Sequence, residues 1–206
     1  MADTNSTDQQ ELQAQLFFHL ISKDDKMVTQ VCSSHCEGPL QRISVYNDTV
    51  LHMASRFKRS KLVRDLLKML PEERNHELAA TKNNAGSNIL HEVAASDTMK
   101  DVAEGMLKRG PELLIARNDL GETPIFCAAR YGQTEMFKFL AREMKLTEDG
   151  KQYLQRTDRT TVLHISIFTE CFGEFFSQFI CKFFPINIEI IGYPKCRLRK
   201  AKPQPI

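Results

Sequence analysis

Three of the six histidines recur in one short phrase, and imidazole is the side chain that most often binds metals or transfers protons near neutral pH. His52, His91 and His164 each follow a leucine at the same point of that phrase. A metal site needs ligands that converge on one centre, whereas residues at one point of a repeated unit lie in different layers. We therefore expect these histidines to have a structural role and to bind no metal.

The cysteines also lack the partners that their chemistry needs. Cys32, His35 and Cys36 have an allowed zinc spacing, but no second ligand pair stands at a matching distance. A nucleophile at Cys127 would need a base held by a third group. The sequence contains no glycine-rich phosphate loop and no pair of carboxylates in an apolar setting. We expect no catalytic residue, no metal, no cofactor and no small-molecule substrate, so the protein is predicted not to be an enzyme.

Composition narrows the partners and the compartment. The chain has 206 residues and a formal net charge of +2, which gives it no strong field for nucleic acid. Its polar, acidic start lacks the basic and apolar regions of a secretory signal. Six irregularly spaced cysteines then fit reduced thiols in a cytosolic or nuclear compartment. We expect a cytoplasmic protein.

The elements that would position these residues belong to a repeat. Four copies of the phrase begin 39, 35 and 38 residues apart, close to a helical repeat period of roughly 33 residues. Insertions of a few residues fit surface loops, because loop-closure entropy grows slowly with length. The copies are Thr49–Ser55, Asn88–Ala94, Thr123–Ala129 and Thr161–Ile167.

Each copy has the features of a helix start followed by close packing. The first residue is expected to cap a helix by accepting a backbone N–H, and Pro124 fits the first turn. Small residues such as Ala54, Ala94 and Ala128 allow helices to approach one another. A second helix follows, with apolar residues at helical spacing, as in Met136–Leu140.

These phrases resemble ankyrin repeats over roughly residues 46–170. The resemblance implies an all-α solenoid of β-turns and antiparallel helix pairs, in which the histidines bond to the turn backbone. The wording of Asp48–Ser55 and Gly86–Ala94 looks most like the plant ankyrin proteins that end in a membrane-spanning PGG domain.

The chain is expected to divide into four parts. Residues 1–11 are predicted to be a disordered tail, 12–45 a pair of degenerate capping helices, 46–171 about four repeats with the last incomplete, and 172–206 an atypical Phe-rich and basic tail. Residues 175–191 are too short and too interrupted for a membrane span, although contact with a membrane through 172–202 stays open. Because the repeat pattern stops abruptly near Cys171, we hypothesise a truncated or alternatively spliced form.

A repeat stack presents turn tips and helix starts as a concave binding surface. We therefore predict a scaffold or adaptor that binds protein partners, plausible by resemblance in plant stress or defence signalling. The alternative is a membrane-associated subunit that pairs with full-length PGG-domain relatives. For Phe57, packing between repeats is the competing hypothesis. The predicted partner-binding residues are Arg56, Phe57, Asn84, Ser87, Asp119, Leu120, Glu122, Arg130 and Tyr131.

Overall fold

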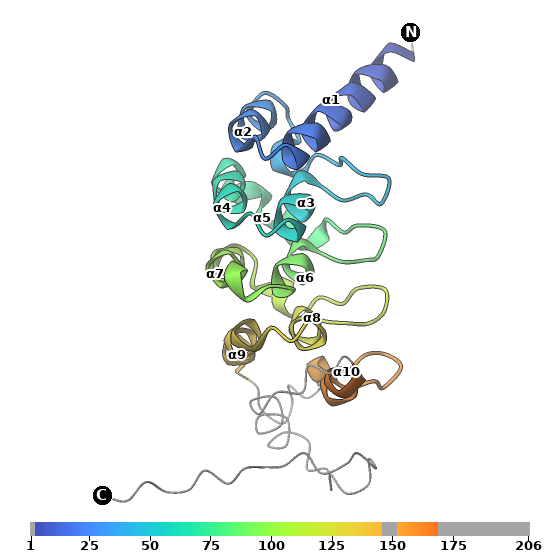
Figure 1. The fold of residues 1–206 in the computed structure, drawn as a ribbon, viewed down its shortest axis with the longest axis vertical. Coiled ribbons are helices and arrows are strands. Elements are labelled where there is room, and N and C mark those ends of the chain that lie inside the picture. The colour runs from blue at the N-terminus through green and yellow to red at the C-terminus, as the bar shows by residue number, and fades with distance from the viewer. Residues whose placement is uncertain (1–2, 146–151, 169–206) are drawn as a thin grey trace, which may run out of the picture.

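The computed structural model describes residues 3–145 and 152–168, and within these ranges the regular structure is helical (Figure 1). The helices stack in two columns, and a loop projects from one of them, here called the inner column, at the layers of α3, α6, α8 and α10. The all-α prediction is confirmed. The inner column contains α1 (Asp3–Ile21), α3 (Val50–Arg56), α6 (Ile89–Ala94), α8 (Pro124–Arg130) and α10 (Val162–Phe168), and the outer column contains α2 (Asp25–Ser33), α4 (Ser60–Met69), α7 (Lys100–Arg109) and α9 (Thr134–Glu143), with α5 (Asn75–Ala80) in a connection.

The first two helices pack at the start of the stack, in the segment 12–45 for which we expected a pair of capping helices. Leu16 and Leu20 of α1 are each 1% exposed, and the side chain of Asp24 caps α2 by accepting the N–H of Met27 at 3.1 Å. However, α1 begins at Asp3, within the segment for which we expected a disordered tail, and its first turns extend beyond the stack. Gln and Glu are good helix formers, so a helix nucleated on the packed half extends into this polar segment.

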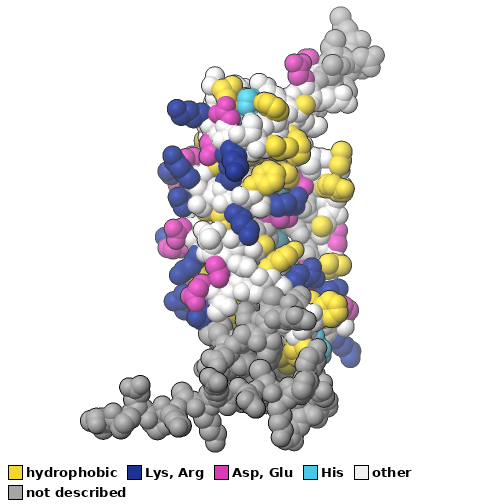
Figure 2. All heavy atoms as spheres, in the orientation of Figure 1, with side chains coloured by type: hydrophobic (Ala, Val, Ile, Leu, Met, Phe, Trp, Pro, Cys, Tyr) yellow, Lys and Arg dark blue, Asp and Glu magenta, His cyan; other side chains and the backbone are white. Residues whose placement is uncertain are grey.

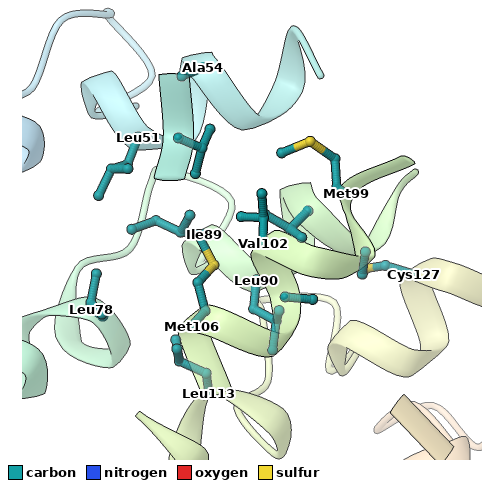
Figure 3. Close-up of a cluster of buried hydrophobic side chains, with 14 of the residues drawn as sticks. Leu51, Ala54, Leu78, Ile89, Leu90, Met99, Val102, Met106, Leu113 and Cys127 are labelled. Carbon is teal, nitrogen blue, oxygen red and sulfur yellow. The ribbon is translucent and has the colours of Figure 1, made fainter. Parts of the chain in front are cut away.

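One continuous apolar core runs between the two columns (Figure 3). Ile89 and Leu90 of α6 are at most 1% exposed, and they meet Val102 and Met106 of α7, which are inaccessible. Burial of a leucine-sized side chain contributes about 1.5–3 kcal/mol. The helices approach closely because alanines fill the contact points. Four of these, Ala54, Ala94, Ala128 and Ala129, are 0% exposed.

The projecting loops are tight β-hairpins, which we call hairpins 1 to 4 (residues 42–49, 82–88, 117–123 and 155–161). Gly121 has φ +78°, and a Cβ there would lie 2.6–2.8 Å from atoms of Thr157 in the next hairpin. Glycine is needed at this point for both its backbone conformation and its close neighbour. Hairpins 1 and 4 tolerate Asn47 (φ 58°) and Arg159 (φ 68°) at the same point.

The predicted last part of the repeat array and the tail lie mostly outside the described residues. The fourth copy is seen as hairpin 4 and α10, which ends at Phe168. The expectations for 172–206, including membrane contact through 172–202, therefore fall on residues that the structure does not describe.

Candidate protein-interaction surface

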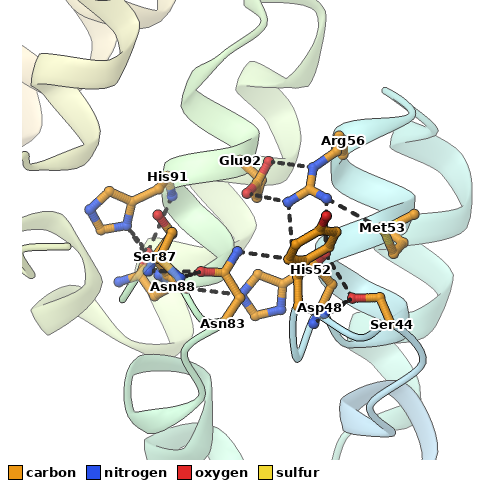
Figure 4. A network of polar contacts seen from close by, with 12 residues as sticks. Ser44, Asp48, His52, Met53, Arg56, Asn83, Ser87, Asn88, His91 and Glu92 are labelled. Atoms are coloured by element: carbon orange, nitrogen blue, oxygen red, sulfur yellow. Dashed lines mark hydrogen bonds and ion pairs between the residues drawn. The ribbon is translucent and has the colours of Figure 1, made fainter. Parts of the chain in front are cut away.

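Two of the recurrent histidines, His52 and His91, each connect an inner helix to the hairpin of the following repeat (Figure 4). In the first repeat, the backbone N–H of Thr49 donates to His52 Nδ1 at 3.3 Å, and the opposite ring nitrogen Nε2 donates to the carbonyl of Ser87 at 3.1 Å. His91 Nε2 makes the same bond to the carbonyl of Glu122, at 3.0 Å. Both rings are buried, and both bond the turn backbone as the resemblance implied.

Burial also sets the charge of these rings. Removal from water lowers the pKa of His52, and it lowers the pKa of His91 to about 4, because a charged imidazolium is poorly solvated inside the stack. Both histidines are therefore neutral at pH 7. Among residues 3–145 and 152–168, no cluster of three or more His, Cys, Asp or Glu side chains is placed to hold a metal ion. Burial likewise raises the pKa of the Cys127 thiol to about 12, so this sulfur is protonated at neutral pH.

The predicted helix caps are confirmed at three copies, including Thr161, which accepts the N–H of His164 at 3.4 Å, and wrong at the copy that begins with Thr123. The side chains of Thr49 and Asn88 accept the N–H groups of the histidines three residues later. Thr123 makes no such cap, and its hydroxyl instead donates to the carbonyl of Tyr153 at 2.7 Å. The third copy has Phe126 in place of histidine, so no ring nitrogen is present to complete the reciprocal pair.

Six of the nine predicted partner-binding residues are exposed on the hairpins and inner helices, and a seventh, Arg130, is partly exposed. Phe57, Leu120 and Tyr131 are 42%, 48% and 54% exposed, so Phe57 presents a large part of its ring to solvent. The side chain of Arg130 is 25% exposed. The remaining exposed residues of the prediction are Arg56, Asn84 and Asp119.

Two predicted contacts are corrected by the structure, because Ser87 and Glu122 are buried, at 7% and 1% exposure. The carboxylate of Glu122 forms an ion pair with Arg130 and lies 3.6 Å from Arg156 of the next hairpin. A carboxylate held between two guanidinium groups is stabilised beneath the surface, where a partner does not reach it. The turn position looked exposed from sequence because the arginine of the following repeat was not foreseeable as its partner.

A matching charge cluster fixes Arg56 in the first repeat. Asp48 is 1% exposed and accepts two hydrogen bonds from the guanidinium of Arg56, at 2.9 and 3.0 Å. Arg56 also bonds Glu92 of the next repeat at 2.8 Å. Burial alone would raise the pKa of Asp48, but the hydrogen bonds from Arg56 and Asn83 outweigh it and lower the pKa. Arg56 is therefore held in one position on the surface.

Sequence reasoning missed the apolar tip of hairpin 1. Val45 and Tyr46 are 87% and 66% exposed. The N–H of Asn84 donates to the carbonyl of Tyr46 at 2.8 Å, so the backbone of this tip is joined to the next hairpin. Apolar side chains recur along the hairpin side of the stack (Figure 2). The available signal was a valine–tyrosine pair within a turn that is otherwise polar.

The residue that opens each of the first three hairpins is cationic, and each contacts its counterpart in the next repeat. Arg42 donates to the carbonyl of Lys82 at 3.1 Å, Lys82 Nζ donates to that of Arg117 at 3.1 Å, and Arg117 donates to that of Gln155 at 2.8 Å. We call Arg42, Lys82 and Arg117 the cation row. In hairpin 4 the position is neutral.

The comparisons agree with this architecture. Residues 51–152 match the family model of ankyrin repeats, in three copies. No curated protein matches the chain significantly. None of the helices in the described ranges is both long enough and apolar enough to cross a lipid bilayer. With its paired helices, projecting hairpins and histidine bonds, the described chain is an all-α ankyrin-repeat solenoid.

Proposed function

We propose that the protein is a non-enzymatic scaffold that binds a protein partner on the hairpins and inner helices. Ankyrin repeats are in general a protein–protein interaction module, and this chain has three matched copies. The apolar core is occupied by the packing of the repeats themselves. The hairpin side carries the exposed aromatic side chains of Tyr46, Phe57 and Tyr131 on a fixed backbone.

The observation that carries this proposal is a pair of arginine–aromatic sequences two repeats apart. Arg56 precedes Phe57 and Arg130 precedes Tyr131, each at the end of an inner helix. Both arginines are held by buried carboxylates, and both aromatic rings are exposed. Arginine and aromatic residues contribute most of the binding energy in many interfaces, above all when they are held in place beforehand.

The test is quantitative affinity purification with Phe57→Ala combined with Tyr131→Ala. The matched control is Phe18→Ala combined with Ile115→Ala, because these side chains are also exposed, at 66% and 47%, but lie on α1 and in the connection after α7. We expect the first variant to lose partners that the control and the unchanged protein recover. Equal recovery by all three proteins, each with an unchanged melting temperature, contradicts the proposal.

We further propose that the protein acts in the cytoplasm, in plant stress or defence signalling. The support is the wording of Asp48–Ser55 and Gly86–Ala94, which resembles plant PGG-domain ankyrin proteins. The alternative is a truncated, membrane-associated form that pairs with full-length relatives through residues 172–202. Fractionation with and without residues 172–206 separates the two: recovery only with the soluble fraction, in both cases, contradicts the alternative.

A further inference from the structure

The cation row is held by backbone carbonyls and not by carboxylates. Among the described residues, Arg42, Lys82 and Arg117 form no ion pair. A carbonyl acceptor positions a guanidinium or ammonium group but leaves its positive charge uncancelled. Lysine has three donors and arginine five. The exposed Lys82 donates one side-chain hydrogen bond, so it can bind a further acceptor.

The segments around the cation row also carry a net positive charge. The segments that form the hairpins and inner helices (41–58, 81–95, 116–131 and 155–168) contain eight cationic and five anionic side chains, a net of +3. Four of those anions, Asp48, Glu92, Glu122 and Asp158, already face arginines. A surface with excess positive charge attracts an anionic partner and disfavours a cationic one.

The spacing of the row indicates the shape of that partner. Packed helices lie about 8–10 Å apart, so successive members of the row are separated by about one such step. A polyproline II chain rises about 3.1 Å per residue with three residues per turn. Side chains at every third residue of such a chain therefore lie on one face, about 9 Å apart, and match one repeat each.

Apolar side chains on the same hairpins complete the surface. Val45, Tyr46 and Leu120 are all at least 48% exposed. Extended, proline-rich segments commonly bind aromatic and apolar surfaces, because little conformational entropy is lost when they dock. The intervening residues of a partner segment would contact these tips while its carboxylates face the row.

We propose that the hairpin side binds an extended acidic segment of a partner protein, with carboxylates at about every third residue, along Arg42, Lys82 and Arg117. This inference rests on the proposed scaffold function and specifies its partner. The row stops at Gln155, so three carboxylates, one for each cation, are the expected contact.

The direct test uses the full chain and a fluorescent nine-residue peptide of three Glu-Pro-Leu triplets, with binding measured by anisotropy. One comparison peptide has the same composition with its three glutamates adjacent, and another has lysine in place of glutamate. We expect the spaced acidic peptide to bind most tightly and to weaken as salt rises. Equal binding of all three peptides, or no binding of the spaced acidic peptide, overturns the proposal.

A charge reversal on the protein locates the contact. We expect Lys82→Glu to weaken binding of the spaced peptide by about tenfold, because an attraction becomes a repulsion at one contact. Lys61→Glu on α4 is the matched control: it makes the same charge change at another exposed lysine, on the outer column, and should leave binding unchanged. Both variants are first checked for an unchanged melting temperature, with Lys82→Gln as the milder substitute. Equal weakening by Lys61→Glu and Lys82→Glu, or none by Lys82→Glu, overturns the proposal.

Failure of the acidic-segment proposal can be distinguished from failure of the proposed scaffold function. Partners that depend on Phe57 and Tyr131 but bind the Lys82→Glu protein normally would uphold the scaffold and overturn the acidic segment. Loss of those partners with both sets of substitutions supports both inferences.

Discussion

The buried histidine of the second repeat should make the stability of the stack depend on pH. Burial lowers the pKa of His91 to about 4 in the folded chain, whereas an unfolded histidine titrates near 6.5. Between these values the unfolded chain binds more protons than the folded one. The free energy of unfolding should therefore be highest above pH 6.5, fall as the pH decreases, and stop falling from this cause below about pH 4.

The size of the effect follows from the same two pKa values. At pH 5 the linkage relation gives a loss of about 2 kcal/mol from His91 alone. His52, whose pKa is also lowered by burial, contributes in the same direction. Asp48 acts in a separate window, since its lowered pKa affects stability only as the pH falls below the ordinary range of an aspartate.

His91→Phe isolates the contribution. Phenylalanine already occupies the corresponding position at Phe126, where it is 0% exposed, so the ring should fit. The carbonyl of Glu122 keeps the hydrogen bond from the N–H of Asn118 at 3.0 Å, so we expect a cost near 1 kcal/mol at pH 7. Between pH 7 and pH 5 the unchanged protein should lose about 2 kcal/mol more than the variant.

The assay is urea unfolding followed by circular dichroism at half-unit steps of pH. His76→Phe, at an exposed position, is the control and should keep the full pH dependence. Parallel pH curves for the unchanged protein and His91→Phe would refute the reasoning, because they would show that His91 titrates alike in the folded and unfolded chains.

Four further substitutions test the packing of the repeats, each by the change in the free energy of unfolding. Gly121→Ala should destabilise by more than about 1 kcal/mol because of its positive φ and close neighbour, whereas Gly105→Ala in α7, with open space around it, should stabilise by about 0.5–1 kcal/mol; a shared sign would contradict this. Asp97→Ala should cost about 1 kcal/mol, because Asp97 accepts the N–H of Met136 at 2.7 Å and so caps α9 from the preceding repeat; no change would argue against that cap. Leu90→Ala should cost about 2–5 kcal/mol, since Leu90 is inaccessible, and a smaller loss would mean that the core closes over the gap.

The fold was predictable because the same local sequence features occur in each copy of the repeat. Capping residues, Pro124 and small alanines each agree with one helical unit, and the copies reinforce one another. The start of α1 could not be predicted, because its first residues are polar and show no helical spacing of apolar side chains. The second half of α1 packs on the stack, and the helix extends from it into the polar segment. This packing is visible only in the tertiary structure.

The surface was predictable in outline and not in its individual contacts. Turn positions were assigned as exposed, and this holds for Asp119 and Leu120 but not for Glu122. Glu122 is buried by Arg156, which lies in another repeat. The same limit applies to Thr123, whose hydroxyl partner, the carbonyl of Tyr153, is set by packing between layers. Contacts between repeats depend on the stacking distance, which no single repeat encodes.

The bonds that the cation row and the buried histidines make between repeats all point the same way. The cation row, His52 and His91 each donate from one repeat to a carbonyl of the next. This set of bonds therefore gives the stack a direction, from the first repeat toward the last. A duplicated unit inserted between two others would find a donor before it and offer one after it, so gene duplication can lengthen the array without leaving a bond unmatched.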